Sequence, residues 1–420
     1  MALSWLLLLL LLLQQELLLP TCSAAPVAPL VPTATRTRVD SSMGPNLRGH
    51  RVRPVAQPSA RAPPDAALAA AIEDVMSYAR LHMHDITSPS ANVTANLSAT
   101  LNNTYTFTAA QTWHRFHAGD GTVFVDTGDI HQQWLRDSSN QMRVYIPLAK
   151  TSKPVADVFV NALKRMAQYF VGDAYASAFN PLPRDQMGDS SLYSQCPKSL
   201  ECLNCTCDDC APTCSQYSYQ HNFELDSFCF TVDLAHRYWN ATNDARAFDQ
   251  HFHTALSKFV DLLVTEQDHG NLSPYRFRTN WTDQSAPNNH VAPPKPTAKV
   301  GLLWSDSRPS DDREEFNYNI PQNMFATVAL TKAAELASKV FNDPGLAARA
   351  TNLSASVNEA IEIYGVFNGN LTVPKMYAFE VDGFGNQVLM DDANMPNLLG
   401  IPYMVPLCQP HRVQITEHLC

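Results

Sequence analysis

A succession of segments with helical periodicity constrains the fold of this chain more than any other feature of its sequence. Apolar residues recur at helical spacing in most of the chain after residue 137, as on the buried face of a helix. The segments with this pattern are 137–150, 154–171, 223–239, 246–267, 321–341 and 345–363, with a further start near 393. Long polar and aromatic loops separate them, so the sequence predicts an all-α helical toroid more than a compact bundle.

The part of the chain before residue 137 is expected to combine a helix with a small β element. A helix is predicted from Asp65, directly after two prolines, to about His82. Between Tyr105 and Val125, aromatic and polar residues alternate around an Asp-Gly pair. This alternation predicts a small N-terminal β-hairpin that leads into the helical region.

The first residues have the features of a secretory signal peptide. Residues 1–25 contain an unbroken leucine run followed by small residues suited to cleavage. No Lys or Arg precedes the run, so an uncleaved anchor is the alternative, but the apolar stretch is shorter than the roughly 20 residues that a membrane span requires. Residues 26–64, rich in Pro, Ala and Arg, are expected to form a disordered linker. No stable membrane span is expected.

Glycosylation sequons support the secretory route. Nine Asn-x-Ser/Thr sequons predict a glycoprotein that is secreted or held in the Golgi or ER lumen. They lie at Asn92, Asn96, Asn102, Asn204, Asn240, Asn271, Asn280, Asn352 and Asn370. The net charge of −10 argues against a nucleic-acid partner, because surfaces that bind nucleic acids are basic.

Six of the ten cysteines lie in one segment, between Cys196 and Cys214. The segment contains two CxxC pairs, so a zinc site must be considered. Only Thr206 separates the two pairs, which is too short a spacing for an ordinary zinc ribbon. In an oxidising compartment, disulfides within a Cys-rich insertion are the better interpretation, and no metal is assigned. Cys229 and Cys408 are left to pair or to stay buried.

Residues 128–141 concentrate side chains that are suited to sugar recognition. The candidate sugar contacts there are Asp129, Trp134, Arg136 and Asp137. An indole can pack on the axial C–H face of a sugar ring, and guanidinium and carboxylate groups can bind its hydroxyls in pairs. The alternative is a structural Arg–Asp pair beside a core tryptophan, because ion-pair networks produce similar clusters.

A second stretch, 303–313, repeats this combination with Trp304, Arg308, Asp311 and Asp312. Adjacent carboxylates oppose each other's ionisation, and a carboxyl that stays protonated near neutral pH can act as a general acid. The alternative is a pair of helix-entry acids, which are common before helices.

A third stretch, 221–230, contains Glu224 and Asp226 at the start of a predicted helix. Residues two positions apart do not share a helix face, so one can belong to a site while the other is a helix-start charge. We assign Asp226 to the site. The alternative is that both are helix-start charges.

Together, four stretches resemble glycoside hydrolase family 125, the exo-α-1,6-mannosidases, also known as the meiotically up-regulated gene 157 protein family. In the family's order they are Thr-Gly-Asp-Ile…Trp-Leu-Arg-Asp-Ser at 127–138, Glu-Leu-Asp-Ser at 224–227, Trp-Ser…Arg-Pro-Ser-Asp-Asp at 304–312 with Ile-Pro-Gln-Asn-Met-Phe at 320–325, and Asp-Gly-Phe-Gly-Asn…Asp-Asp-Ala-Asn-Met-Pro at 382–396. The resemblance covers residues from about 65 to 403, and the combination of motifs is specific.

This resemblance implies an (α/α)6 barrel that hydrolyses terminal α-1,6-linked mannose with inversion, without metal or cofactor. The implied substrate is a mannose-containing oligosaccharide or glycoprotein glycan. Trp134, Arg136 and Asp137 match sugar-binding positions of the family. The general acid falls in the Ser-Asp-Asp motif; the choice between Asp311 and Asp312 stays open, with Asp312 preferred.

The sequence departs from the family toward residue 420. The family's general base is a glutamate in a segment resembling His-Glu-Ser-Phe, which these residues lack, and residues 404–420 do not resemble the family. We expect an incomplete toroid at 65–403, from a truncated or alternatively ended product, and an impaired mannosidase that lacks its base. The alternatives are a non-catalytic mannose- or glycan-binding protein on this scaffold and another toroidal glycosidase of the glucoamylase type.

Overall fold

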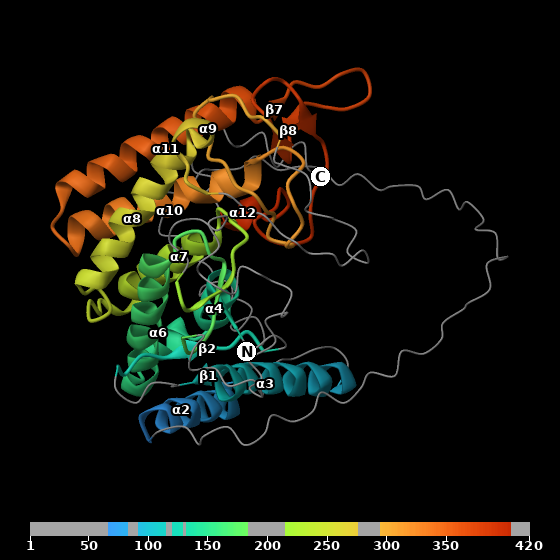
Figure 1. Cartoon of the computed structure of the whole chain (residues 1–420). Helices are drawn as coiled ribbons and strands as arrows, with labels where there is room; N and C mark the ends of the chain where they lie inside the picture. Colours follow the sequence, from blue (N-terminus) through green and yellow to red (C-terminus); the bar gives the residue numbers. More distant parts are fainter. Residues whose placement is uncertain are drawn as a thin grey trace. The chain divides into compact units, whose positions relative to one another are not determined.

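The computed structural model of the chain describes residues 66–82, 91–114, 120–128, 132–183, 215–275 and 295–404 (Figure 1). The chain divides into two compact units, and the larger comprises residues 62–84 and 97–420. In the smaller unit, residues 1–61 and 85–96, the described part is the beginning of one helix. The predicted signal peptide, linker and Cys-rich insertion, and residues 405–420 of the predicted tail, lie outside the described residues.

The six segments of helical periodicity between residues 137 and 363 each contain a helix, which confirms the predicted all-α class. The further start expected near 393 lies in a non-helical stretch, and the next helix begins at Ile401. The helices are α2 (Ala66–His82), α3 (Ala91–Thr112), α4 (Leu135–Arg143), α5 (Ile146–Ala149), α6 (Lys153–Gly172), α7 (Ser227–Thr242), α8 (Gln250–Glu266), α9 (His269–Leu272), α10 (Ile320–Lys339), α11 (Pro344–Tyr364) and α12 (Ile401–Met404). Polar N-caps define several starts: Ser152 Oγ accepts from Val155 N at 3.1 Å before α6, and Asn319 Oδ1 accepts from Gln322 N at 3.0 Å before α10.

The predicted hairpin over Tyr105–Val125 was wrong in its first part, because residues up to Thr112 belong to α3. The aromatic Tyr105 packs on Tyr145, with ring centroids 4.6 Å apart, so tertiary contact holds this segment in the helix. A short antiparallel pair does follow. Strand β1 (Trp113–His114) pairs with β2 (Phe124–Val125), and Trp113 lies opposite Val125.

Short strands arrange the loops between the helices. One antiparallel sheet has the order β3 (Gln133–Trp134), β4 (Ala178–Phe179) and β5 (Ser218–Gln220). A second has the order β10 (Gln387–Val388), β9 (Glu380–Val381) and β6 (Tyr318–Asn319), and β7 (Val366–Phe367) pairs with β8 (Met376–Tyr377). Since β3 leads directly into α4 and β6 into α10, each sheet fixes the direction in which a helix leaves it.

The hydrophobic core lies where the helices of the larger unit pack. Helix α10 packs against α11 and α7, α6 packs against α8 and α2, and α4 packs against α7. Figure 1 shows α8, α10 and α11 side by side. Stacked rings join neighbouring helices: Phe170 lies on Phe228 at 3.8 Å between centroids, and Phe159 on Tyr238 at 5.0 Å.

The described helices do not close into a barrel, in agreement with the expected incomplete toroid. Within the same residues, no helix combines the length and the apolar character that crossing a bilayer demands.

A core substitution in α8 tests this packing. Phe252 is fully buried and meets Phe248 edge-on, with centroids 5.1 Å apart. We expect Phe252→Ala to lower the free energy of unfolding by about 3–5 kcal/mol, because a cavity replaces the ring. Urea unfolding followed by circular dichroism measures the change. Val264→Ala, in the exposed part of the same helix, is the control; equal losses in both variants would contradict this packing.

Candidate active site

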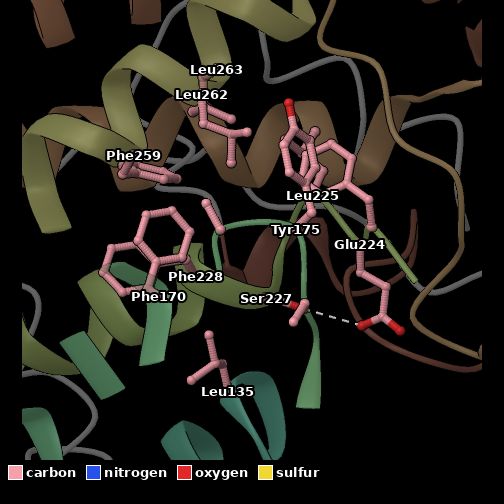
Figure 2. Close-up of a pocket in the computed structure, with 13 residues that line it drawn as sticks. Leu135, Phe170, Tyr175, Glu224, Leu225, Ser227, Phe228, Phe259, Leu262 and Leu263 are labelled. Atoms are coloured by element: carbon pink, nitrogen blue, oxygen red, sulfur yellow. Dashed lines mark hydrogen bonds between the residues drawn. The ribbon is translucent and has the colours of Figure 1, made fainter. Parts of the chain in front are cut away.

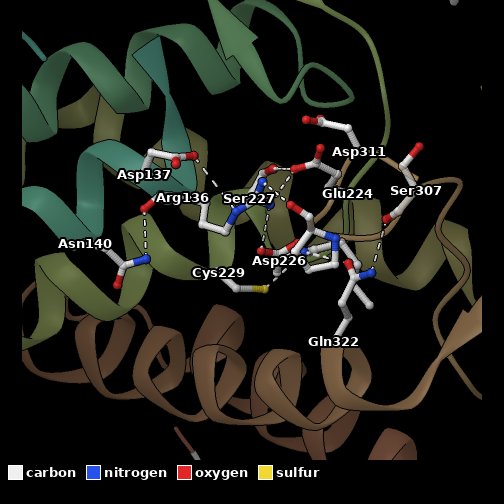
Figure 3. A network of polar contacts seen from close by, with 12 residues as sticks. Arg136, Asp137, Asn140, Glu224, Asp226, Ser227, Cys229, Ser307, Asp311 and Gln322 are labelled. Atoms are coloured by element: carbon white, nitrogen blue, oxygen red, sulfur yellow. Dashed lines mark hydrogen bonds and ion pairs between the residues drawn. The ribbon is translucent and has the colours of Figure 1, made fainter. Parts of the chain in front are cut away.

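One buried guanidinium joins three segments that are distant in sequence. Arg136 lies in the first turn of α4, directly after β3, and its side chain is 11% exposed. Nη1 donates to Glu224 Oε2 at 2.6 Å and to Asp226 Oδ2 at 3.1 Å, and Nη2 donates to Pro309 O at 3.0 Å. Figure 3 shows Arg136 pointing from α4 toward both carboxylates. These bonds bring α4, the start of α7 and the loop around residue 309 together.

Burial and charge oppose each other in this cluster. Burial lowers the pKa of Arg136, but Glu224 and Asp226 raise it above its ordinary value, so the guanidinium stays charged. Burial raises the pKa of Glu224 well above its ordinary value, against the effect of Arg136, and it also raises the pKa of Asp226. Among the described residues, Glu224 Oε1 and Asp226 Oδ1 are buried without a hydrogen-bond partner. Both carboxyl groups therefore act on the site through Arg136, whose guanidinium they hold.

A cleft of about 300 Å³ opens beside this cluster. Its lining residues are Thr127, Trp134, Arg136, Asp137, Pro309, Ser310, Asp311, Asn394 and Met395. The volume is at the lower end of the range for small-molecule sites, which run from roughly 300 to 1,000 Å³. An indole, a guanidinium and two carboxylates around so small a space are suited to one sugar unit.

The loop that carries Asp311 has a defined shape. Asp311 has a φ of +66°, its N–H donates to Arg308 O at 3.0 Å, and Arg308 N–H donates to Asp312 O at 2.8 Å. Ser310 Oγ donates to Asp392 Oδ2 at 2.8 Å, which ties the loop to the segment that supplies Asn394 and Met395. The turn directs Asp311 into the cleft lining, whereas the neighbouring Asp312 is not part of that lining.

A second buried ion pair connects this loop with strand β9. Arg308 Nε donates to Glu380 Oε1 at 2.6 Å. Glu380, fully buried on β9, also accepts from the backbone N–H groups of Glu315 at 2.8 Å and Phe316 at 3.1 Å. Arg308 is thus engaged with the sheet behind the loop, where its guanidinium also lies 5.5 Å from the centroid of the Phe379 ring.

The structure brings together only part of the predicted site. Trp134, Arg136, Asp137 and Asp311 line the cleft, and Asp226 binds Arg136 beside it. Trp304, Arg308 and Asp312 are not in the lining, and Asp129 lies outside the described residues. The functional roles assigned to these residues stay predictions.

Trp304 lies in the hydrophobic core and not in the cleft. It is 1% exposed and stacks on His269, with ring centroids 3.5 Å apart. His269 Nδ1 pairs with Glu266 Oε2 at 2.6 Å, and the backbone N–H of Trp304 donates to the backbone oxygen of Glu266 at 3.1 Å. In this position the indole contributes to packing.

Sequence reasoning left out Glu224, Gln220 and five residues of the cleft lining, which are Thr127, Pro309, Ser310, Asn394 and Met395. Glu224, which makes the shorter of the two carboxylate bonds to Arg136, was weighed but not chosen. Its place in the Glu-Leu-Asp-Ser motif was the available signal. Asn394 and Met395 belong to the Asp-Asp-Ala-Asn-Met-Pro motif at 391–396, which was the available signal for them. Gln220, which binds Asp311, carries no local signal, because strand pairing brings it to the Asp311 loop.

A second, enclosed cavity of about 10 Å³ lies beside Glu224 (Figure 2). Its walls are mainly apolar and include Leu135, Phe170, Phe228 and Phe259. The space suits about one water molecule and no substrate, and its apolar surroundings explain why burial dominates the pKa of Glu224. In the described part of the chain, no group of three His, Cys, Asp or Glu residues is arranged to hold a metal ion.

The buried carboxyl of Glu224 predicts a pH dependence of stability. Because burial raises the pKa of Glu224 above its ordinary value of 4.5, ionising it costs folded-state stability as the pH rises above that value. We expect the free energy of unfolding of the wild type to fall relative to Glu224→Gln as the pH rises above about 4.5. Urea unfolding at several pH values measures this difference. A difference that is constant with pH would contradict the raised pKa.

The Arg308–Glu380 pair predicts a large stability effect. Glu380→Gln leaves a buried guanidinium without its carboxylate, so we expect a loss of about 3–5 kcal/mol in the free energy of unfolding. Glu335→Gln, which removes a half-exposed partner of His236, is the matched control and should cost less than about 1 kcal/mol. Thermal and urea unfolding measure both, and similar values for the two variants would refute the importance of the buried pair.

The chain is similar in sequence to a known protein family. The model of a family described as metal-independent α-mannosidase (GH125) matches residues 94–414. The meiotically up-regulated gene 157 protein of Schizosaccharomyces pombe is 28% identical over 301 residues, which cover 70% of this chain and 57% of that protein. The chain therefore spans little more than half the length of this relative.

A solved structure is also similar. It is a metal-independent α-mannosidase of Streptococcus pneumoniae in a non-productive complex with α-1,6-mannobiose, with a TM-score of 0.66 and 27% identity. The match covers 84% of this chain and 76% of that one. This likeness confirms the predicted helical fold of the (α/α)6 type.

Proposed function

The chain belongs to glycoside hydrolase family 125, the metal-independent α-mannosidases, and we propose that it releases terminal α-1,6-linked mannose from glycans with inversion of configuration. The observation that carries this proposal is that Trp134, Arg136 and Asp311 line the same cleft. The α-1,6-mannobiose bound to the similar pneumococcal enzyme supports the same linkage as the substrate here.

The sugar is bound by groups of opposite character. Trp134 packs against the axial C–H face of the mannose ring, and Arg136 and Asp137 bind its hydroxyls. Glu224 and Asp226 hold the guanidinium of Arg136 in place beside the sugar. This arrangement binds a neutral sugar without placing an uncompensated charge against it, because the Arg136 charge is already balanced by the carboxylates.

Asp311 acts as the general acid. It protonates the glycosidic oxygen while the bond to the anomeric carbon breaks, and a base activates a water molecule on the opposite face of the sugar. Asp311 is favoured over Asp312, the preference from sequence, because Asp311 lines the cleft beside Arg136. In inverting enzymes the acid and base carboxyl groups lie roughly 6.5–9.5 Å apart.

These 420 residues by themselves hydrolyse the substrate slowly. They contain no segment resembling His-Glu-Ser-Phe, which carries the base in the family. Losing one acid–base group typically slows a reaction by about 10²- to 10⁴-fold. A small external nucleophile such as azide can take the place of the activated water.

We also propose a location in the secretory pathway with glycosylation at exposed sequons. The asparagines at 240, 271, 352 and 370 are exposed, as attachment of a glycan requires. Signal-peptide cleavage and disulfides in the 196–214 segment belong to the same proposal.

The test is hydrolysis of α-1,6-mannobiose by the purified chain, with and without azide. We expect slow release of β-mannose, acceleration by azide with β-mannosyl azide as product, and loss of at least about 10²-fold in Asp311→Asn. Asp312→Asn is the matched control and should retain turnover. ¹H NMR of the anomeric proton identifies the products.

Other outcomes separate the alternatives. If only Asp312→Asn loses turnover, Asp312 and not Asp311 is the general acid. An α-configured product would exclude inversion. Binding of mannobiose without turnover, even with azide, would favour the glycan-binding protein on the same scaffold.

A further inference from the structure

The side chain of Gln220 reaches from β5 to the loop that carries Asp311. Gln220 Nε2 donates to Asp311 Oδ1 at 2.7 Å. Within the described ranges, this is the one side-chain hydrogen bond of the Asp311 carboxyl. Building on the proposed function, we infer that Gln220 is a positioning residue that orients the Asp311 carboxyl group for proton donation to the glycosidic oxygen.

Strand pairing sets the distance between Gln220 and the aromatic wall of the cleft. Trp134 on β3 lies opposite Ala178 on β4, and Ala178 lies opposite Gln220 on β5. The three residues form one row across the sheet, which separates the first and third backbones by roughly 10 Å. The same sheet therefore positions both the Trp134 indole, which faces the sugar, and the Gln220 amide, which binds Asp311.

The residues around Gln220 are firmly anchored. His221 Nε2 and Ser218 Oγ each lie 2.5 Å from Asp173 Oδ2, and the Tyr275 hydroxyl donates to His221 O at 2.7 Å. Burial raises the pKa of Asp173, but His221 outweighs this and the net pKa is lowered, so the anchor stays ionised at neutral pH. Gln220 thus reaches Asp311 from a fixed backbone position.

The hydrogen bond determines which carboxyl oxygen delivers the proton. An N–H donor on Oδ1 leaves Oδ2 as the oxygen that carries the acid proton. In the reaction, this proton passes to the glycosidic oxygen, which also takes the electron pair of the breaking C–O bond, and Asp311 becomes a carboxylate. The bond from Gln220 then becomes charge-assisted and stronger, so it stabilises the transition state more than the ground state.

The experiment compares two substrates with different needs for an acid. α-1,6-Mannobiose has a poor leaving group that must be protonated, whereas 2,4-dinitrophenyl α-mannoside has a leaving group that departs without protonation. Both are assayed with the full chain in the presence of azide, as wild type and as Gln220→Ala and Gln220→Glu. Gln216→Glu, the same chemical change at an exposed position of the same segment, is the matched control.

We expect both Gln220 variants to lose about 10- to 100-fold in kcat on mannobiose, a part of the full effect of a general acid, and less than about 3-fold on the aryl mannoside. KM for mannobiose and the thermal unfolding midpoint should stay close to wild type. The Gln216→Glu control should match wild type on both substrates.

Two results would overturn the inference alone. Equal losses on both substrates would assign Gln220 a structural role, and full activity on mannobiose would assign it none. A wild-type chain that turns over neither substrate would instead refute the proposed function, and the positioning role with it.

Discussion

The pairing of Arg136 with Glu224 and Asp226 is the interaction on which the rest of the site depends. A buried charge is costly unless it is paired, so the guanidinium and the two carboxylates are stable only when their segments meet. The pair spans 88 residues of sequence and is completed by a backbone oxygen of the 308–312 loop. Assembly of the cleft and folding of the larger unit are therefore coupled.

A second buried ion pair also connects two segments that are distant in sequence. Arg308 and Glu380 form a buried pair that connects the 308–312 loop with β9. The 308–312 loop is thus attached at two points. Its backbone oxygen at Pro309 accepts from Arg136, and its own Arg308 side chain binds Glu380. Since Asp311 has a left-handed backbone conformation, this double attachment offsets the strain of the turn and keeps its carboxyl in the cleft lining.

Periodicity predicted the helices well where it was long and regular. The segment predicted at 154–171 is helix α6, Lys153–Gly172, and the one at 345–363 is α11, Pro344–Tyr364. It failed at Tyr105, where alternation in the sequence suggested a strand and packing on Tyr145 supports a helix. Tryptophan was also ambiguous, because the same residue type lines the cleft at 134 and lies in the core at 304.

The sequence by itself determined the helical class, the family and the chemical composition of the site, since spacing and residue types are local properties of the chain. The tertiary structure decided that Asp311 lines the cleft and Asp312 does not, that Glu224 is the nearer carboxylate to Arg136, and that Gln220 reaches the acid. Each of these depends on contacts across 88 to 91 residues of sequence or on one turn's backbone angles. Such contacts arise from packing, which residue order alone does not express.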